Sequence, residues 1–302
     1  MKHMKFLSFF LGIAFAIIAC SSNNETIPAP EVDPDGDDGT TEVEFAKGAD
    51  IGWVTEYESK GYNFYNAKGE QRECTALMKE LGLDAIRIRV WVDPSKHGNW
   101  CNTADVVEKA KRAKELGMDV MIDFHYSDWW ADPAQQNKPA SWVGKNLANL
   151  KSAIKDHTVS VLQALKEIGV IPKWVQVGNE IRPGMLWDED VALSGASYNV
   201  TEKDLKDAPA SATDKVVYPM NWANLGAFVT TGYDAVKSVF PDAIVIVHLD
   251  NGWDSGLFTW FFDELKKNGG KWDMIGMSLY PYWSRDAKEG YSSADAVITD
   301  CI

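Results

Sequence analysis

One glutamate, Glu180, stands where a buried strand is predicted to end. Residues 173–180 read KWVQVGNE, an apolar run that follows Pro172 and stops at Gly-Asn-Glu. A short run with valine on alternate positions is typical of a buried strand. In a barrel of parallel strands, the C-terminal strand ends hold the catalytic groups. Glu180 is therefore a candidate for catalysis, and the alternative is an ordinary strand end whose glutamate caps the next helix.

A second group of polar and aromatic residues follows another predicted strand. Residues 123–133 read DFHYSDWWADP, with Gln136, Pro139 and Trp142 behind them. The Asp-x-His-x-x-Asp spacing would suit metal ligands, but no second histidine cluster lies nearby in the sequence. Imidazole and carboxylate groups also hydrogen-bond hydroxyls, and indole faces stack on sugar rings. The segment therefore favours sugar recognition over a metal site.

Two arginines lie on one face of a third predicted strand. Residues 86–91 read IRIRVW, and the two-residue period of a strand puts Arg87, Arg89 and Trp91 on the same side. Arginines that point into a core must meet carboxylates, because a buried unpaired charge is costly. We expect a structural ion pair for Arg87. Arg89 lies closer to the C-terminal end, where it is placed to hold a catalytic carboxylate ionised.

Strands and helices that alternate along the chain would position these groups. Strands are predicted at 49–54, 84–92, 119–125, 174–178, 243–248 and 274–279, and helices at 75–81, 104–116, 150–168, 221–240, 260–267 and from 294. Strict alternation indicates parallel pairing with right-handed crossovers, and no G-x-G-x-x-G follows the first strand. The pattern predicts an α/β fold, a (β/α)8 TIM barrel. About six of its eight βα units are found, so we expect the N-terminal three-quarters of a longer protein.

Composition limits the possible partners. The chain has 302 residues, 45% hydrophobic and 25% charged, which is typical of a globular protein. Its net charge of −14 disfavours a phosphate-binding face, so nucleic acid is not an expected partner, whereas a neutral sugar is compatible. The 13 tryptophans suit both core packing and sugar stacking.

The N-terminal residues are predicted to be a targeting signal. A basic start is followed by an apolar run over 6–19, too short to span a bilayer, and then by Cys20. This resembles a bacterial lipoprotein signal, so we expect a signal peptide over 1–19, a lipid anchor on Cys20 and a disordered linker over 20–44. Ser21 after the cysteine favours the outer membrane or cell surface. The alternative is a plain secretory signal with an incidental cysteine.

Other segments yield weaker predictions. The acidic stretch at 33–39 lacks the glutamate of a calcium loop. A disulfide between Cys74 and Cys101 is possible in an oxidising compartment, and Cys301 would be left over. The long acidic loop over 188–219 is expected to shape a substrate cleft.

Five segments together resemble glycoside hydrolase family 53. They are GAD at 48–50, RIRVWVDP at 87–94, DFHYSD at 123–128, WADP at 130–133 and VGNE at 177–180. The resemblance covers the chain from about Gly48 onward, so the catalytic barrel is expected over 45–302. It implies an endo-β-1,4-galactanase that acts on type I arabinogalactan and retains the anomeric configuration.

The resemblance also implies roles for single residues. Glu180 is similar to the family's proton donor, and Asn179 would bind the sugar 2-hydroxyl. Arg89 and Tyr280 would orient the nucleophile and keep it ionised. Galactan would be bound by His125, Tyr126, Ser127, Asp128, Trp130 and His248, of which His248 would line the −1 subsite.

The resemblance leaves one catalytic group unassigned. A retaining glycosidase needs a second carboxylate about 5–5.5 Å from the first, and in this family it follows the seventh strand. Asp250, Asp254 and Glu289 are the nearest late acids, and none follows a recognisable seventh strand. We therefore expect this chain to lack its nucleophile and to be inactive alone. No cofactor is expected, any calcium loop of the family would lie in the missing part, and the protein is expected to be a monomer.

Two other functions fit the same residues. One is a non-catalytic surface lipoprotein that binds glycan. The other is a clan A hydrolase of a different β-linked polysaccharide, such as mannan or xylan.

Overall fold

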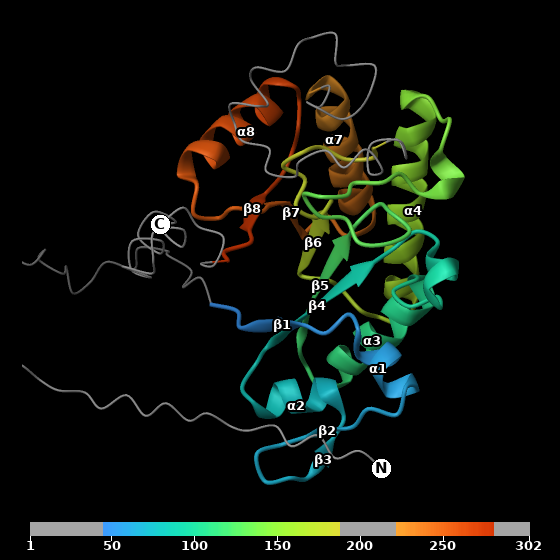
Figure 1. The fold of residues 1–302 in the computed structure, drawn as a ribbon, viewed down its shortest axis with the longest axis vertical. Coiled ribbons are helices and arrows are strands. Elements are labelled where there is room, and N and C mark those ends of the chain that lie inside the picture. The colour runs from blue at the N-terminus through green and yellow to red at the C-terminus, as the bar shows by residue number, and fades with distance from the viewer. Residues whose placement is uncertain (1–44, 188–221, 281–302) are drawn as a thin grey trace, which may run out of the picture. The chain divides into compact units, whose positions relative to one another are not determined.

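A parallel sheet forms the centre of the molecule (Figure 1). The computed structural model describes residues 45–187 and 222–280. Every neighbouring pair of strands in this six-stranded sheet is parallel. In spatial order the strands are β1 (Gly48–Asp50), β4 (Ala85–Val90), β5 (Asp119–Phe124), β6 (Trp174–Val177), β7 (Ile244–Leu249) and β8 (Met274–Met277). Spatial order thus follows chain order, as it does in a (β/α)8 barrel, and six barrel strands lie in the described ranges.

Helices connect the successive strands. They are α1 (Val54–Ser59), α2 (Cys74–Glu80), α3 (Thr103–Glu115), α4 (Leu147–Glu167), α7 (Trp222–Val239) and α8 (Ser255–Lys267). Asn102, Asn146 and Asp254 cap the starts of α3, α4 and α8 by accepting a backbone N–H three residues on. Among the helices of the described ranges, none combines the length and apolar character that crossing a bilayer requires.

Smaller elements complete the described chain. A hairpin of β2 (Phe64–Tyr65) and β3 (Gln71–Arg72) lies between α1 and α2. Two 3-10 turns are η1 (Pro94–His97) and η2 (Ala140–Trp142). The helices α4 and α7 pack along each other, as Figure 1 shows.

The strand register places charged and polar side chains at one level. Arg89 is the β-sheet partner of Asp123, and Asp123 is the partner of Gln176. The alternate strand residues, such as Ile88 and Val175, are fully buried in the apolar core. One face of the sheet therefore carries a polar layer, which the next subsection describes.

The structure confirms most predicted elements and corrects several boundaries. The first strand ends at Asp50 rather than at residue 54, because the chain turns at Gly52 and Val54 begins α1. The predicted helix over 260–267 begins at Ser255, where Asp254 caps it. The sequence patterns did not predict α1 or the hairpin. The targeting segment over 1–44, the loop over 188–219 and the helix from 294 lie outside the described residues.

Candidate active site

The end of β6 has an unusual backbone. Gly178 and Glu180 both have positive φ, +81° and +48°, a conformation that glycine adopts easily and glutamate rarely. A Cβ on Gly178 would lie 2.5 Å from Ile181 Cγ2, so a larger residue is excluded there. The buried Gln136 donates its amide hydrogens to the carbonyl oxygens of Asn179 at 2.7 Å and Glu180 at 3.2 Å. This clamp stabilises the strained backbone that carries Glu180.

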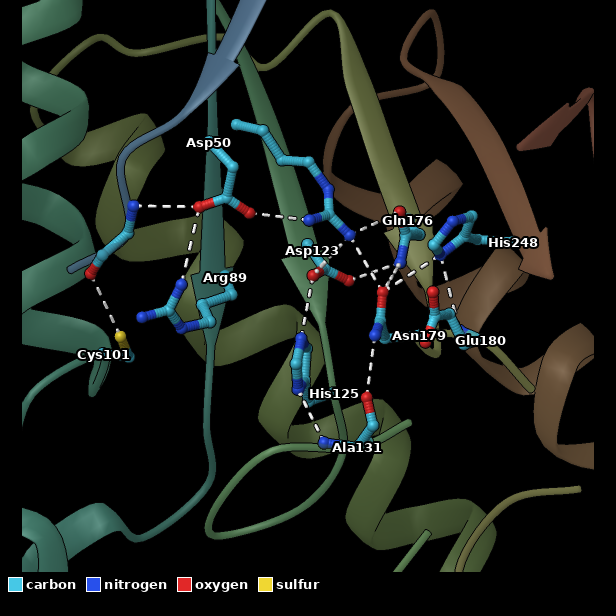
Figure 2. Close-up of polar contacts among 12 residues, drawn as sticks. Asp50, Arg89, Cys101, Asp123, His125, Ala131, Gln176, Asn179, Glu180 and His248 are labelled. Atoms are coloured by element: carbon cyan, nitrogen blue, oxygen red, sulfur yellow. Dashed lines mark hydrogen bonds and ion pairs between the residues drawn. The ribbon is translucent and has the colours of Figure 1, made fainter. Parts of the chain in front are cut away.

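Asn179 is the hub of the polar layer (Figure 2). Its Oδ1 accepts hydrogen bonds from Arg87 at 2.9 Å and from Gln176 at 3.0 Å. Its Nδ2 donates to the backbone carbonyl of Ala131 at 2.7 Å. His248 Nδ1 lies 3.0 Å from the same Oδ1. The Asn179 amide is therefore fixed in orientation, and one of its two N–H hydrogens is engaged by Ala131.

Arg87 joins two carboxylates to this hub. It forms ion pairs with Asp50 at 2.6 Å and with the fully buried Asp123 at 2.8 Å. Burial alone would raise the pKa of Asp123, but the charge of Arg87 and a 2.9 Å contact with His125 hold that pKa below its usual value. Asp123 is thus a fixed negative charge, and Arg87 is compensated by it.

Glu180 has the properties of an acid that works near neutral pH. Its Oε1 lies 2.6 Å from Ser278 Oγ, just beyond the end of β8. The pKa of Glu180 is raised to about 7, and burial is the largest cause. A hydrogen bond from Ser278 to the ionised carboxylate and the charge of Arg87 act against the rise, and the charges of Asp250 and Asp132 favour it. A carboxyl group with such a pKa can give up a proton and take one back.

His248 lies between Asn179 and Ser278. Besides the contact with Asn179, its Nε2 lies 2.9 Å from Ser278 Oγ. Burial and the nearby charge of Arg87 together lower the pKa of His248 to about 4. The imidazole is therefore neutral at the pH where Glu180 titrates. The structure brings His248 to Glu180, as Figure 2 shows.

Three residues predicted to bind substrate make hydrogen bonds within the protein. Tyr126 has a φ of +51° and is 1% exposed, and its hydroxyl is hydrogen-bonded to Thr158 of α4 at 2.8 Å. Its side chain thus points toward the helix layer. The buried Ser127 accepts from the backbone N–H of Trp129. The two carboxylate oxygens of Asp128 accept the backbone N–H groups of Asp93 and Ala140, so Asp128 braces two loops.

His125 is also held by the protein. It is 2% exposed, its Nε2 lies 2.9 Å from Asp123, and its Nδ1 accepts the backbone N–H of Ala131 at 3.0 Å. Trp91 Nε1 lies 3.3 Å from the same Nδ1. Both ring nitrogens are engaged, so His125 positions Asp123 and the Ala131 loop instead of contacting a sugar hydroxyl.

Of the remaining predicted residues, Trp130 and Tyr280 are exposed and Arg89 is buried. Trp130 is 38% exposed, and the guanidinium of Arg89 stacks 4.2 Å from the centre of its ring. Arg89 approaches Asp50 at 3.5 Å. Tyr280 follows β8 and is 56% exposed. Of the two arginines, Arg87 contacts Asn179, whereas Arg89 lies under Trp130.

Four residues of the site had no predicted catalytic role. Arg87 was expected to form an ordinary ion pair, and Gln136, Gln176 and Ser278 were given no role. The alternation of residues 174–177 places Gln176 between two core valines. A polar residue inside a buried strand was the sequence signal that could have identified Gln176 as part of the site. Ser278 and Gln136 act from turns, where sequence spacing carries no such information.

Other predictions concern cysteines and metals. Cys74 and Cys101 are free, buried thiols, so the possible disulfide between them is absent. Among residues 45–187 and 222–280, no group of three His, Cys, Asp or Glu side chains could hold a metal ion.

The chain is similar to proteins of one known family. The model of glycosyl hydrolase family 53 matches residues 46–299. The chain is 34% identical over 247 residues to an arabinogalactan endo-β-1,4-galactanase of Thermothelomyces thermophilus, and 38% identical over 242 residues to an uncharacterized protein in the bgaB 5' region of Niallia circulans. These matches cover 80% of this chain but 65% and 60% of the relatives, so the chain spans less than two-thirds of their length.

Solved structures give the same result. A structure of a fungal β-1,4-galactanase matches with a TM-score of 0.66 and 32% identity, over 79% of this chain and 64% of that one. The catalytic domain of an Ignisphaera aggregans protein of family 53 matches with the same TM-score and identity, over 79% of this chain and 60% of that one.

Proposed function

Because the chain belongs to glycosyl hydrolase family 53, we propose that the protein hydrolyses internal β-1,4-galactan bonds of type I arabinogalactan with retention of configuration. One observation carries the proposal. Glu180 lies just after β6, has a pKa of about 7, and lies beside the Asn179 amide, which contacts Arg87 and His248. The names of the relatives as galactanases supply the substrate class.

Glu180 acts as the acid and then as the base. In the first step its carboxyl proton passes to the leaving glycosidic oxygen while a second carboxylate attacks the anomeric carbon. In the second step Glu180 takes a proton from the water that releases the sugar. The free N–H of Asn179 donates to the sugar 2-hydroxyl.

The second carboxylate is assigned outside the described residues. Asp123 is paired with Arg87, and Asp250 accepts two hydrogen bonds from Arg182, at 2.7 and 2.8 Å. Each forms an ion pair with an arginine inside the protein, and neither is assigned the role of nucleophile. The absence of the nucleophile from this chain stays a prediction, as does inactivity of residues 1–302 alone.

Replacement of Glu180 tests the function. In the full-length gene product, Glu180→Gln is expected to lower reducing-sugar release from galactan by about 10²-fold or more, because no proton reaches the leaving oxygen. Glu167→Gln, at the exposed end of α4, is the matched control and keeps full activity. Proton NMR of the first product reports retention.

Three results would contradict the proposal. The first is a Glu180→Gln variant that keeps more than half the activity. The second is a preference for mannan or xylan over galactan. The third is galactan binding without turnover by the full-length gene product, which would identify a glycan-binding lipoprotein instead.

We also propose that the protein is a lipoprotein of the outer membrane or cell surface, anchored through Cys20, and that the hydrolysis needs no cofactor. The basic start, the apolar run over 6–19 and the cysteine after it support the anchor. Cys20→Ala is expected to move the protein from the membrane fraction to the soluble fraction, and unchanged fractionation would contradict the anchor.

Two carboxyl groups suffice for the chemistry, so chelator treatment should leave the rate unchanged.

A further inference from the structure

We propose that Ser278 and His248 form a proton relay in which Ser278 accepts a hydrogen bond from protonated Glu180, rather than donating one to its carboxylate. The relay would keep the proton of the acid in place in the free enzyme. Only the use of this proton in catalysis rests on the proposed function. The hydrogen-bond arrangement itself does not depend on that function.

The argument begins at Asn179, whose amide orientation is fixed at both ends. Nδ2 donates to the Ala131 carbonyl, and Oδ1 accepts from Arg87 and Gln176. Oδ1 can therefore only accept, and His248 Nδ1 at 3.0 Å must carry a hydrogen. The backbone N–H of Glu180 also points to this Nδ1, but at 3.4 Å it is the longer and weaker contact.

The number of hydrogens on His248 and Ser278 determines which group donates in the next two contacts. A neutral imidazole with its hydrogen on Nδ1 has a bare Nε2, which can only accept. Ser278 Oγ lies 2.9 Å from this Nε2 and has one hydrogen, which it must donate there. The 2.6 Å contact between Ser278 Oγ and Glu180 Oε1 then needs a hydrogen from the carboxyl group. All these contacts are satisfied when Glu180 is protonated.

The same number of hydrogens allows a second arrangement, in which Glu180 is ionised and His248 is positively charged. The surrounding charges favour the neutral arrangement. Asp250, just after β7, and Asp132, in the loop after β5, face Glu180 and favour its neutral form, against the charge of Arg87 of β4. His248 faces Arg87 and His125, which disfavour a positive imidazole, and Asp123, which favours it. Burial keeps both groups neutral, because it raises the pKa of Glu180 and lowers that of His248.

The relay has a consequence for the acid. If Glu180 loses its proton, Ser278 must turn its hydrogen toward the carboxylate, and its oxygen then faces the bare Nε2 of His248. Two acceptors would oppose each other at 2.9 Å, so ionisation is disfavoured. A leaving oxygen that reaches the carboxyl competes with Ser278 Oγ for the same hydrogen, and the bond to the sugar breaks as that oxygen takes it.

The position of the hydrogen on each histidine gives the first test. Nitrogen-15 NMR of the imidazoles of the wild-type chain at neutral pH is expected to show His248 with its hydrogen on Nδ1. His125 is an internal control with the opposite expectation, since its Nδ1 accepts from Ala131. A hydrogen on Nε2 of His248 would overturn the relay. The measurement needs no turnover, so it is independent of whether galactan is the substrate.

Ser278→Ala gives the second test, because the two roles of Ser278 predict opposite signs. A serine that donates to a carboxylate lowers its pKa, so its removal would raise the titration midpoint of Glu180. The relay predicts a fall of about one pH unit, comparable to the loss of one hydrogen bond. Carbon-13 NMR of labelled glutamate measures the midpoint, with Glu180→Gln to assign the signal. A rise or no change would overturn the proposal.

Two further measurements separate the possible failures. Ser278→Thr keeps a hydroxyl and is expected to restore the wild-type midpoint, whereas a purely steric role of Ser278 would not be rescued. In an active enzyme, the alkaline limb of kcat/KM should move to lower pH in Ser278→Ala. A shifted NMR titration in a protein that does not hydrolyse galactan would leave the relay standing and reject the proposed function.

Discussion

At the scale of single residues, the proposed catalytic role of Glu180 conflicts with stability. An unfolded chain gives the carboxyl an ordinary pKa of 4.5, whereas the fold raises the pKa to about 7. Between these values the folded chain binds more protons than the unfolded chain, so stability falls as the pH rises from 4.5 to 7. The acid is therefore destabilising at the alkaline end of its working range.

Glu180→Gln should remove this conflict. At pH 8 the variant is expected to be more stable than the wild type by roughly 3 kcal/mol, because no buried charge has to form. At pH 4 the two proteins should be equally stable. Urea unfolding at both pH values measures the difference, with Glu167→Gln as the surface control. A difference that does not vary with pH would contradict the raised pKa.

The predictability of single residues depends on where they lie. Glu180 follows β6 and His248 lies near the end of β7, and parallel strands end at one edge of a sheet, so their proximity could be predicted. Tyr126 and Asp128 also follow a strand, but a positive φ at Tyr126 turns the chain, and the two side chains form hydrogen bonds with α4 and with a neighbouring loop. Nothing in the sequence pattern signals that turn.

At the scale of elements, glycines allow close packing of helices and strands. A Cβ on Gly226 of α7 would lie 2.2 Å from the backbone oxygen of Asn268, which ends α8. A Cβ on Gly232 would lie 2.5 Å from Val177 of β6. The position of α7 against the sheet and α8 therefore depends on two residues that have no side chain.

Gly226→Ala should show how rigid this packing is. The contact is with backbone, which cannot move aside alone, so a loss of about 2–3 kcal/mol is expected. Gly117→Ala is the control, since its added Cβ would meet nothing within 4 Å and only the φ of +63° is unfavourable. That strain is about 1 kcal/mol. Urea unfolding of both variants would reject the packing argument if Gly117→Ala were the more destabilised.

The elements themselves were largely predictable. Amphipathic helices that end at Gly82, Gly117 and Gly169 are recognisable because glycine takes the left-handed position after a helix. The strand over 119–124 is recognisable from its apolar run. The short helix after Gly52 was not, because its six residues bury only Val54 and carry no periodic signal.

At the scale of the whole molecule, charge limits the choice of polymer. A net charge of −14 is compatible with a neutral galactan and repels acidic pectin chains. The strand order that brings the site together needs parallel neighbours, which the alternation of elements already indicated.

The salt dependence of polymer binding tests this effect of the net charge. Polygalacturonate is expected to bind poorly at low ionic strength and to bind better as salt screens the repulsion. Neutral galactan is the control, and its hydrolysis should vary little with salt. Tight binding of polygalacturonate at low salt, measured by calorimetry, would show that a local basic surface outweighs the net charge.

The stacking of Arg89 on Trp130 has a consequence for sugar orientation. If Trp130 binds sugar, as predicted, the side of the indole that faces the guanidinium is occupied, and a ring would have to approach from the opposite side. In β-galactose the axial 4-hydroxyl gathers the C–H bonds of C3, C4 and C5 on a single face of the pyranose. A platform with one usable side would thus accept galactose in one polarity, and would favour it over glucose, whose equatorial 4-hydroxyl divides that apolar patch.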